Sequence, residues 1–217
     1  MKGWQELWRD PKIRERWEAM PPLPQVEEMA DRLRAEGRNR VLDIGCGLGR
    51  HTVYLAARGF EVTATDNASA ALDACRKNLD ELNLDAELLQ LDMTAMAFPP
   101  GRLHGVVASN VIHHADLSTL ERIIGSITEM LAPGGLFVWV TPTPRHFAFG
   151  RGREIEPGTW IGSGAADGDL PHHYSTEAEV REFLQAYEIL RIEEREYPDD
   201  QGSRFHWRVL ARKRGGP

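Results

Sequence analysis

Short, nearly continuous apolar runs alternate with segments of helical periodicity from residue 40 onward. The apolar runs are typical of strands buried on both faces, whereas the segments between them place apolar residues on one helical face. Strands are predicted at residues 40–44, 60–66, 86–92, 104–110 and 136–142, and helices at 51–59, 71–83 and 117–131. Strands that alternate with helices imply right-handed crossovers, so the pattern predicts an α/β fold with a parallel sheet covered on both faces.

The N-terminal part of the chain is helical in pattern and rich in tryptophan. Residues 4–24 form one such segment, in which Asp10 and Pro11 are a good N-cap and first-turn pair. A second helix is predicted at about residues 26–36 and should end at Gly37, because glycine readily adopts the left-handed conformation that ends many helices.

The C-terminal part departs from the alternation in a different way. Residues 145–174 are rich in glycine and too long for an ordinary connection, which favours a functional segment over a structural one. A helix at 175–187 then begins with a Ser-Thr capping signal. Two strands at 187–196 and 205–213 predict a terminal antiparallel hairpin.

Composition and charge restrict the classes of partner that the chain can bind. The 217 residues are 41% hydrophobic, which fits one domain with a sizeable core. The formal net charge is -7, so no basic field favours a nucleic-acid or anionic-lipid partner. Cys46 and Cys75 form no CxxC pair, no apolar run is long enough to span a bilayer, and the first residues lack the apolar core of a signal peptide. We expect a cytoplasmic protein without a membrane or nucleic-acid partner, as a monomer or homodimer.

The turn after the first predicted strand is the most informative stretch. Residues 43–49, DIGCGLG, carry three glycines spaced one residue more tightly than in the G-x-G-x-x-G turn that binds dinucleotides. Glycines without Cβ atoms let the backbone approach a bulky ligand. The carboxylate of Asp43, two residues before the first glycine, would repel a pyrophosphate but attract a cofactor with an ammonium and a sulfonium. The turn therefore favours a cationic nucleoside.

Two further acids follow the next two predicted strands. Asp66 ends the second strand, where a carboxylate can accept hydrogen bonds from a ribose diol. Asp92 ends the third strand, where it would accept from the amine of an adenine while Met93 lies on the ring face. The three acids are expected at one crevice, because ligands bind where the carboxyl ends of such strands converge. The alternatives are that Asp43 caps a backbone amide, that Asp66 only forms a turn, and that Met93 is ordinary packing.

Five motifs in order resemble class I S-adenosylmethionine-dependent methyltransferases, from about Arg40 to Thr141. They are VLDIGCGLGR, VTATD, LDM, VVASNVIHH and LAPGGLFVWVTPT. The resemblance implies a Rossmann-like, seven-stranded, mostly parallel sheet with helices on both faces and an antiparallel last strand. It implies an enzyme that uses S-adenosylmethionine and releases S-adenosylhomocysteine. By the same resemblance the cofactor is bound by Asp43, Gly45, Cys46, Gly47, Asp66, Asn67, Asp92, Met93 and Asn110.

The resemblance also suggests how the chain is divided. A methyltransferase domain would cover residues 38–217, with an insertion at about 143–175, and a helical lid would cover residues 1–37. Two hypotheses fit the tryptophans at positions 4, 8 and 17: they anchor the first helices to the sheet, or they close over the methyl-transfer mouth. The insertion is expected to help form the acceptor pocket, and the alternative is a surface excursion without a role.

Two histidine pairs stand at places of interest. His113 and His114 follow the fourth strand and are expected to shape the acceptor pocket, and they are candidate catalytic residues together with Tyr174, since a histidine can take a proton from an acceptor O–H or N–H. With His172 and His173 they suggest a metal site. However, adjacent histidines on a helix or strand point in different directions, and no third ligand completes a regular spacing. The sequence therefore predicts no metal.

The motifs also restrict the methyl acceptor. The fourth strand ends SNVI, residues 109–112, without the Asn-Pro-Pro-aromatic run that resembles exocyclic amino methyltransferases. Neither cysteine resembles the nucleophile of cytosine C5 enzymes. A small-molecule acceptor is favoured, with a weaker resemblance to the tellurite-resistance subgroup. The rival hypotheses are a regulatory or partner subunit that binds the cofactor without turnover, and a nicotinamide oxidoreductase.

Overall fold

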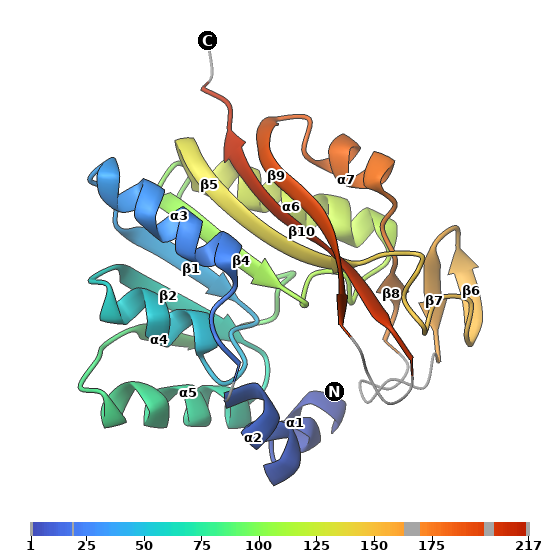
Figure 1. The fold of residues 1–217 in the computed structure, drawn as a ribbon, viewed down its shortest axis with the longest axis horizontal. Helices are drawn as coiled ribbons and strands as arrows, with labels where there is room; N and C mark the ends of the chain where they lie inside the picture. Colours follow the sequence, from blue (N-terminus) through green and yellow to red (C-terminus); the bar gives the residue numbers. More distant parts are fainter. Residues whose placement is uncertain (1, 19, 163–169, 198–201, 216–217) are drawn as a thin grey trace.

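The computed structural model describes residues 2–18, 20–162, 170–197 and 202–215, and its centre is a seven-stranded sheet in the order β3-β2-β1-β4-β5-β10-β9 (Figure 1). The strands are β1 (Arg40–Ile44), β2 (Glu61–Asp66), β3 (Glu87–Gln90), β4 (Leu103–Ser109), β5 (Leu131–Pro142), β9 (Tyr187–Tyr197) and β10 (Arg204–Lys213). β1 to β5 are parallel to one another, whereas β10 is antiparallel to both β5 and β9.

Helices cover both faces of the sheet. On one face lie α3 (Pro24–Ala35), α4 (Arg50–Ala57) and α5 (Ser69–Glu81), and on the other lie α6 (Leu117–Met130) and α7 (Glu177–Phe183) (Figure 1). α1 (Lys2–Leu7) and α2 (Pro11–Glu18) lie beyond the sheet, and α1 contacts α5. Every helix in the described part of the chain is too short or too polar for a membrane span.

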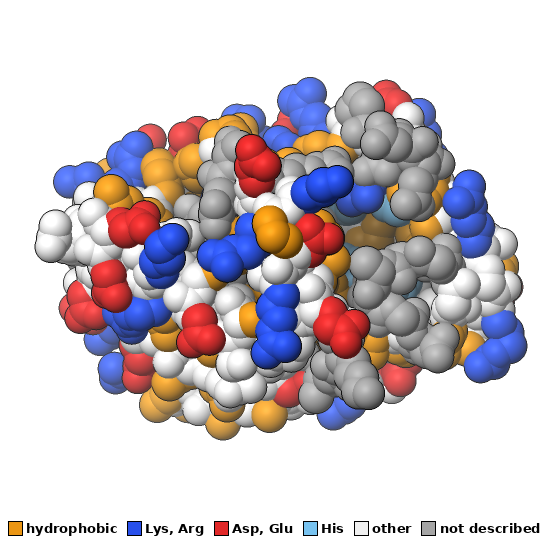
Figure 2. Space-filling model, turned by 90° about the horizontal axis from the view of Figure 1, so that it is seen from below, with side chains coloured by type: hydrophobic (Ala, Val, Ile, Leu, Met, Phe, Trp, Pro, Cys, Tyr) orange, Lys and Arg blue, Asp and Glu red, His pale blue; other side chains and the backbone are white. Residues whose placement is uncertain are grey.

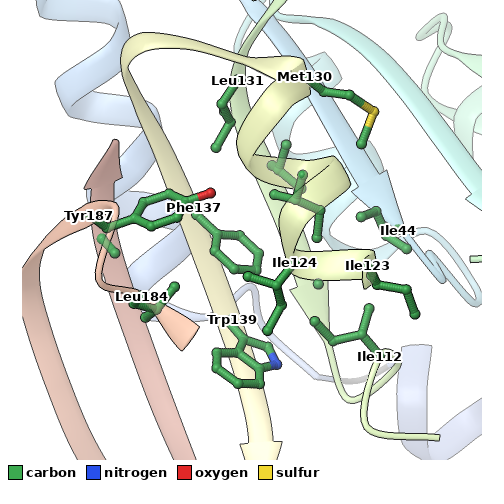
Figure 3. Packing of buried hydrophobic residues seen from close by; sticks show 14 of the residues in the cluster. Ile44, Ile112, Ile123, Ile124, Met130, Leu131, Phe137, Trp139, Leu184 and Tyr187 are labelled. Carbon is green, nitrogen blue, oxygen red and sulfur yellow. The ribbon is translucent and has the colours of Figure 1, made fainter. Parts of the chain in front are cut away.

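Alternate side chains of the central strands belong to two separate cores. Val41 of β1 packs with α3, α4 and α5, whereas Leu42 and Ile44 pack with α6 and α7. β5 follows the same rule, with Val138 in the first core and Trp139 in the second. Figure 3 shows this second core, in which Trp139 lies beside side chains of α6. Burial on both faces explains why the strands read as continuous apolar runs.

The strand order places a crevice at one edge of the sheet. β1 lies between β2 and β4, so the chain leaves β1 toward one side and leaves β4 toward the other. The carboxyl ends of β1, β2 and β4 meet where these connections diverge. In an open α/β sheet, that switch point is where ligands bind.

Part of the glycine-rich insertion forms a small sheet that the sequence pattern did not predict. β6 (Arg153–Glu156), β7 (Thr159–Ile161) and β8 (His172–His173) pair antiparallel in this order, while residues 163–169 lie outside the described residues. The His173 N–H donates a hydrogen bond to the His113 carbonyl at 2.9 Å. The insertion is therefore attached to the loop after β4, beside the switch point.

The predicted fold class is confirmed, with shifts at the ends of some elements. The helix predicted at 175–187 ends at Phe183, because Tyr187 begins β9 and its hydroxyl hydrogen-bonds Thr128 at 2.8 Å. β5 begins at Leu131 rather than at residue 136, since Leu131 pairs with β4 before the glycine turn. The turn of the predicted terminal hairpin falls partly on residues 198–201, outside the described residues.

Candidate cofactor and acceptor site

The glycine turn after β1 is enclosed by neighbouring side chains. Gly45, Gly47 and Gly49 have φ values of 62°, 55° and 85°. A Cβ on Gly45 would lie 2.4 Å from Val111 in the loop after β4, and one on Gly49 would lie 2.4 Å from the sulfur of Cys75 on α5. The first contact brings the loops after β1 and β4 together, and the second lets α4 pack on α5. Glycine is required at both places by conformation and by space.

Asp43 is buried beneath this turn. It is 1% exposed and accepts a hydrogen bond from the Thr52 hydroxyl on α4 at 2.7 Å. Burial raises the pKa of Asp43 to about 7, although the Thr52 hydrogen bond and the charge of Arg50 oppose the rise. The charge of this carboxyl therefore responds to its surroundings near neutral pH, and a cation bound beside it would favour the ionised form.

Asp66 joins the end of β2 to the glycine turn. One carboxylate oxygen accepts from the Gly47 N–H at 3.0 Å, and the other accepts from the Ala68 N–H at 2.9 Å. The Cys46 N–H donates to the Thr65 carbonyl at 2.9 Å, which adds a second link. Burial raises the pKa of Asp66, and hydrogen bonds from the backbones of Ala68, Gly47 and Asn67 counteract the effect. The carboxylate thus holds the turn in shape, and its role toward a ribose stays a prediction.

The other predicted residues near the adenine position are less enclosed. Asp92 accepts hydrogen bonds from the backbone N–H and the hydroxyl of Thr94, at 2.9 and 2.6 Å. Met93 packs against the core on the α6 side, and the backbone carbonyl of Asn67 accepts from a side chain of β3. The structure therefore gives Asp92 a local turn partner, and contact of Asp92 and Met93 with an adenine stays a prediction.

Asn110 directly follows β4 and has an unusual backbone conformation. Its φ is 56°, a left-handed value that few residues other than glycine adopt. Its side-chain oxygen is buried without a hydrogen-bond partner among the described residues. Leaving such a group unpaired costs about 1–3 kcal/mol, so a ligand that donates a hydrogen bond here would be favoured. Because the next residue, Val111, contacts the glycine turn, this oxygen lies beside the crevice.

Three histidines gather in the turn that follows. The rings of His113 and His114 are 4.0 Å apart, because both residues lie in a turn rather than on a helix or strand. His172 of β8 lies 4.6 Å from His114 and 5.9 Å from His113, whereas His173 points away and contacts Phe183 of α7. The sequence argument that adjacent histidines diverge holds for the second pair and is wrong for the first. No regular spacing in the sequence marks a third ligand, yet β8 places His172 beside the first pair.

The predicted catalytic residues surround His172. His113 and His172 are each 5% exposed, and burial, with the neighbouring histidines, holds the pKa of His113 well below its usual value. Tyr174 is 2% exposed, and its ring stacks 6.5 Å from that of His172. His113, His114 and Tyr174 are therefore brought to one place, and their catalytic role stays a prediction.

Aromatic residues from the N-terminus lie across the same region. Trp8, directly after α1, is 8% exposed, and its ring lies 3.1 Å from the position of a Cβ on Gly47. Trp4 contacts His114 edge-on at 4.9 Å. α1 is held by Gln5, whose side-chain oxygen accepts a backbone N–H from the first turn of α5 at 3.2 Å. The segment therefore bridges the glycine turn and the histidines.

Two histidines near the site were not found from the sequence. His146 and His206 have ring centroids 5.3 Å apart, and His146 lies 5.7 Å from Tyr174. Burial lowers the pKa of His206 to about 3. Each stands alone in the sequence, so no spacing marks it, and only the pairing of β10 with β5 brings them together. Figure 2 shows histidine and hydrophobic side chains in a hollow of the surface.

Similarity to known proteins covers the segment from β1 to the first part of β5, which includes the glycine turn, Asp66, Asn110, His113 and His114. Residues 41–135 match the family described as the methyltransferase domain. The demethylmenaquinone methyltransferase of Thermus thermophilus is 34% identical over 115 residues, 51% of this chain and 51% of that protein. The trans-aconitate 2-methyltransferase of Paracidovorax citrulli is 32% identical over 142 residues, 63% of this chain and 51% of that protein. The chain thus spans about half the length of these curated relatives.

Similarity in three dimensions extends over most of the described fold. An S-adenosylmethionine-dependent methyltransferase from Methanosarcina mazei has a TM-score of 0.73 at 20% identity, covering 91% of this chain and 100% of that one. At this identity the likeness establishes the fold alone. The family match covers four of the five motifs and the start of the fifth.

Proposed function

We propose that this chain, whose residues 41–135 match the methyltransferase domain family, is a class I S-adenosylmethionine-dependent methyltransferase that transfers a methyl group to a heteroatom of a small molecule. The observation that carries the proposal is the meeting of three strand ends: the glycine turn, Asp66 and Asn110. Buried acids and an unpartnered amide oxygen suit a cationic nucleoside, whereas a pyrophosphate would be repelled there.

The residues present fit each part of this cofactor. Asp43 would favour the positively charged end, and the Asp66 carboxylate keeps a lone pair for a ribose diol beyond its backbone hydrogen bonds. Asp92 and Met93 would border the adenine, and the Asn110 oxygen would accept a hydrogen bond near the methyl-transfer position. The turn residues Gly45, Gly47, Cys46 and Asn67 would contribute their backbones.

Methyl transfer depends mainly on the alignment of the acceptor atom with the methyl group and its sulfur. The bound cofactor supplies a methyl group on a sulfonium, from which a neutral thioether departs. The chain then has to hold the acceptor atom in line with the methyl carbon and keep water out, and alignment alone contributes on the order of several kcal/mol. We assign the contacts with the acceptor to His113, His114 and Tyr174, which lie together around His172.

The acceptor is proposed to be a small molecule. Phe149 lies 5.8 Å from Trp160 and 5.5 Å from Tyr174, so the insertion offers an aromatic wall beside the histidines. Aromatic walls with a few polar groups are typical of small-molecule pockets. Both curated relatives bear the name of a small-molecule acceptor, a quinone precursor in one case and a carboxylic acid in the other. A cytoplasmic location and a monomer or homodimer remain part of the proposal.

A lid is proposed for the first two helices only. α3 belongs to the body of the domain, because Met29 and Leu33 are fully buried against the sheet. α1 and α2 instead contact the glycine turn, α5 and His114 through aromatic side chains. We therefore restrict the lid to about residues 2–18, which would have to shift for the cofactor to enter.

Calorimetry tests the cofactor assignment. S-adenosylhomocysteine and S-adenosylmethionine should bind at micromolar concentration, and NADH should not. Asp66→Ala should weaken this binding by roughly 1.5–3 kcal/mol, the worth of a charge-assisted hydrogen bond. Asp85→Ala is the matched control, since the side chain of Asp85 is 99% exposed and far along the chain from the turn. Binding of NADH without binding of either sulfur nucleoside would refute the assignment.

An acceptor screen tests the reaction. Release of S-adenosylhomocysteine would be measured with quinols, small carboxylic acids, thiols and amines as acceptors. Turnover with one of these classes supports the proposal. Cofactor binding without release across the panel would instead favour the non-enzymatic partner subunit.

A further inference from the structure

The histidine cluster beside the acceptor site has the composition of a metal centre. His113, His114 and His172 each offer a ring nitrogen, and these atoms lie within 4.8 Å of one another. Three imidazole ligands around one ion with about 2.1 Å bonds have nitrogens roughly 3.4 Å apart. The nitrogens would therefore approach one another by up to about 1.4 Å around an ion, a distance that side-chain rotation can cover.

The backbone holds the cluster together from two distant segments. The His173 N–H donates to the His113 carbonyl at 2.9 Å, which fixes β8 against the turn after β4. The Glu156 carboxylate accepts from the Leu117 N–H at 2.6 Å and from the Thr159 hydroxyl at 3.0 Å, so a second part of the insertion is tied to the start of α6. The approach of His172 to the other two histidines is thus built into the fold.

The orientation of His172 is that of a metal ligand. Its Nδ1 lies 3.0 Å from the Leu170 carbonyl. A carbonyl oxygen only accepts, so Nδ1 carries the proton and the lone pair is on Nε2. Metal-bound histidines usually donate their other ring N–H to a carbonyl or carboxylate in this way.

A buried ring nitrogen of His113 is a second, independent indication of a bound ion. The Nδ1 of this residue is buried and has no hydrogen-bond partner within the described ranges. A buried ring nitrogen left unpaired is costly, and a metal ion would satisfy it. The ligand set contains three neutral nitrogens and no carboxylate, which suits zinc, nickel, copper or ferrous iron better than magnesium or calcium.

We propose that His113, His114 and His172 bind one divalent transition-metal ion with an open coordination position. Three neutral ligands leave the charge of the ion uncompensated, so the open position would favour an anionic oxygen or sulfur. A role in anchoring such an acceptor beside Asn110 rests on the proposed methyl transfer, but the site itself does not. With a metal bound, the histidines act as ligands rather than as direct contacts of the acceptor.

Metal binding can be measured without cofactor or acceptor. The untagged full chain, stripped with a chelator, would be titrated with Co²⁺ and followed by its visible absorption and by NMR of the histidine rings. We expect one equivalent to bind, with paramagnetic shifts on three histidines. His172→Gln and His114→Gln should each weaken Co²⁺ binding roughly 100-fold or more, since even a lost second-shell partner costs 10–100-fold.

A neighbouring histidine provides the control. His206→Gln alters a buried histidine near the cluster that is not one of the three, so Co²⁺ binding should be unchanged. Circular dichroism of each variant separates loss of the site from loss of the fold. Absence of binding in the wild type, binding that survives both ligand substitutions in folded protein, or equal loss in His206→Gln would overturn the proposal. Because no methyl transfer is measured, these outcomes are separate from those of the acceptor screen.

Discussion

Asp43 links the stability of the fold to the charge of the proposed ligand. Burial raises its pKa to about 7 from the ordinary value of 3.8, so the folded state holds the proton more tightly than the unfolded state. The free energy of unfolding should therefore fall as the pH rises from 3.8 to about 7, with no further contribution from this residue outside that window. A cation bound beside Asp43 would reverse part of this loss.

The substitution Asp43→Asn isolates this effect. Asparagine keeps an oxygen for the Thr52 hydroxyl but carries no charge. We expect the variant to be more stable than the wild type at about pH 8, by on the order of 4 kcal/mol at most, and to lose the slope below that pH. Urea unfolding followed by tryptophan fluorescence at several pH values measures both.

Asp116 provides a control, because its pKa is shifted in the opposite direction to that of Asp43. It is the N-cap of α6, and its hydrogen bond from the Thr119 N–H lowers its pKa. The ionised Asp116 carboxylate therefore stabilises the folded state at neutral pH, and this stabilisation is lost when the carboxylate is protonated in acid. Asp116→Asn should accordingly lower the free energy of unfolding at neutral pH and leave it unchanged in acid. For Asp43, the outcome that contradicts the prediction is a free energy of unfolding that varies with pH in the same way in the wild type and in Asp43→Asn. Burial would then not hold the Asp43 carboxyl protonated.

Strands and helices with a clear hydrophobic pattern could be predicted from the sequence, whereas the short polar strands of the insertion could not. β1, β2 and β4 are apolar runs that end in acids or turn formers, and α6 has a clear apolar stripe that is buried in the structure. β6 to β8 were missed because Arg153–Glu156 is polar and exposed, and His172–His173 is only two residues long. Their pairing depends on contacts between distant segments, which periodicity does not contain.

The proposed lid can be tested at the level of one helix. Trp8→Ala removes the ring that lies against Gly47, and Gln5→Ala removes the hydrogen bonds that hold α1 to α5 while leaving Trp8 in place. If α1 covers the bound cofactor, both variants should release S-adenosylhomocysteine roughly tenfold faster, equivalent to about 1.4 kcal/mol. Stopped-flow displacement would measure the rates.

A substitution on the exposed side of the same segment gives the comparison. Lys12 of α2 is exposed, and Lys12→Ala should leave the release rate unchanged. Unchanged rates in Trp8→Ala and Gln5→Ala as well would favour the alternative interpretation, in which the N-terminal tryptophans only anchor the first helices to the rest of the domain.

At the scale of the molecule, the predictable part of the site is the part that topology alone assembles. Asp43, Asp66 and Asn110 lie at or directly after the ends of parallel strands, so the order of the strands brings them to one edge. His172 and Trp8 reach the same edge from the insertion and the N-terminus, through contacts specific to this chain. No spacing in the sequence encodes those contacts, so the sequence pointed to two histidine pairs but could not indicate that His172 meets the first pair.

The same topology makes the whole sheet depend on its last strand. β10 is the final strand of the chain, yet it lies between β5 and β9, with Val209, Leu210 and Ala211 fully buried. Each large apolar side chain contributes about 1.5–3 kcal/mol by burial, and the hydrogen bonds to two neighbouring strands would be lost too. The sum is comparable with the roughly 5–15 kcal/mol of net stability of a typical domain. A chain that ends at residue 203 should therefore show no cooperative urea transition by circular dichroism.

A chain that ends at residue 214 tests whether truncation as such is harmful. It keeps β10 and the hydrogen bond from the Arg214 N–H to the Ala186 carbonyl at 3.0 Å, so its urea midpoint should match that of the full chain. If the chain ending at residue 203 still unfolded cooperatively and bound S-adenosylhomocysteine, β1 to β5 with their helices would be a self-sufficient unit. The antiparallel pair would then be an addition to the domain, because the core on both faces would persist without the three buried apolar residues of β10.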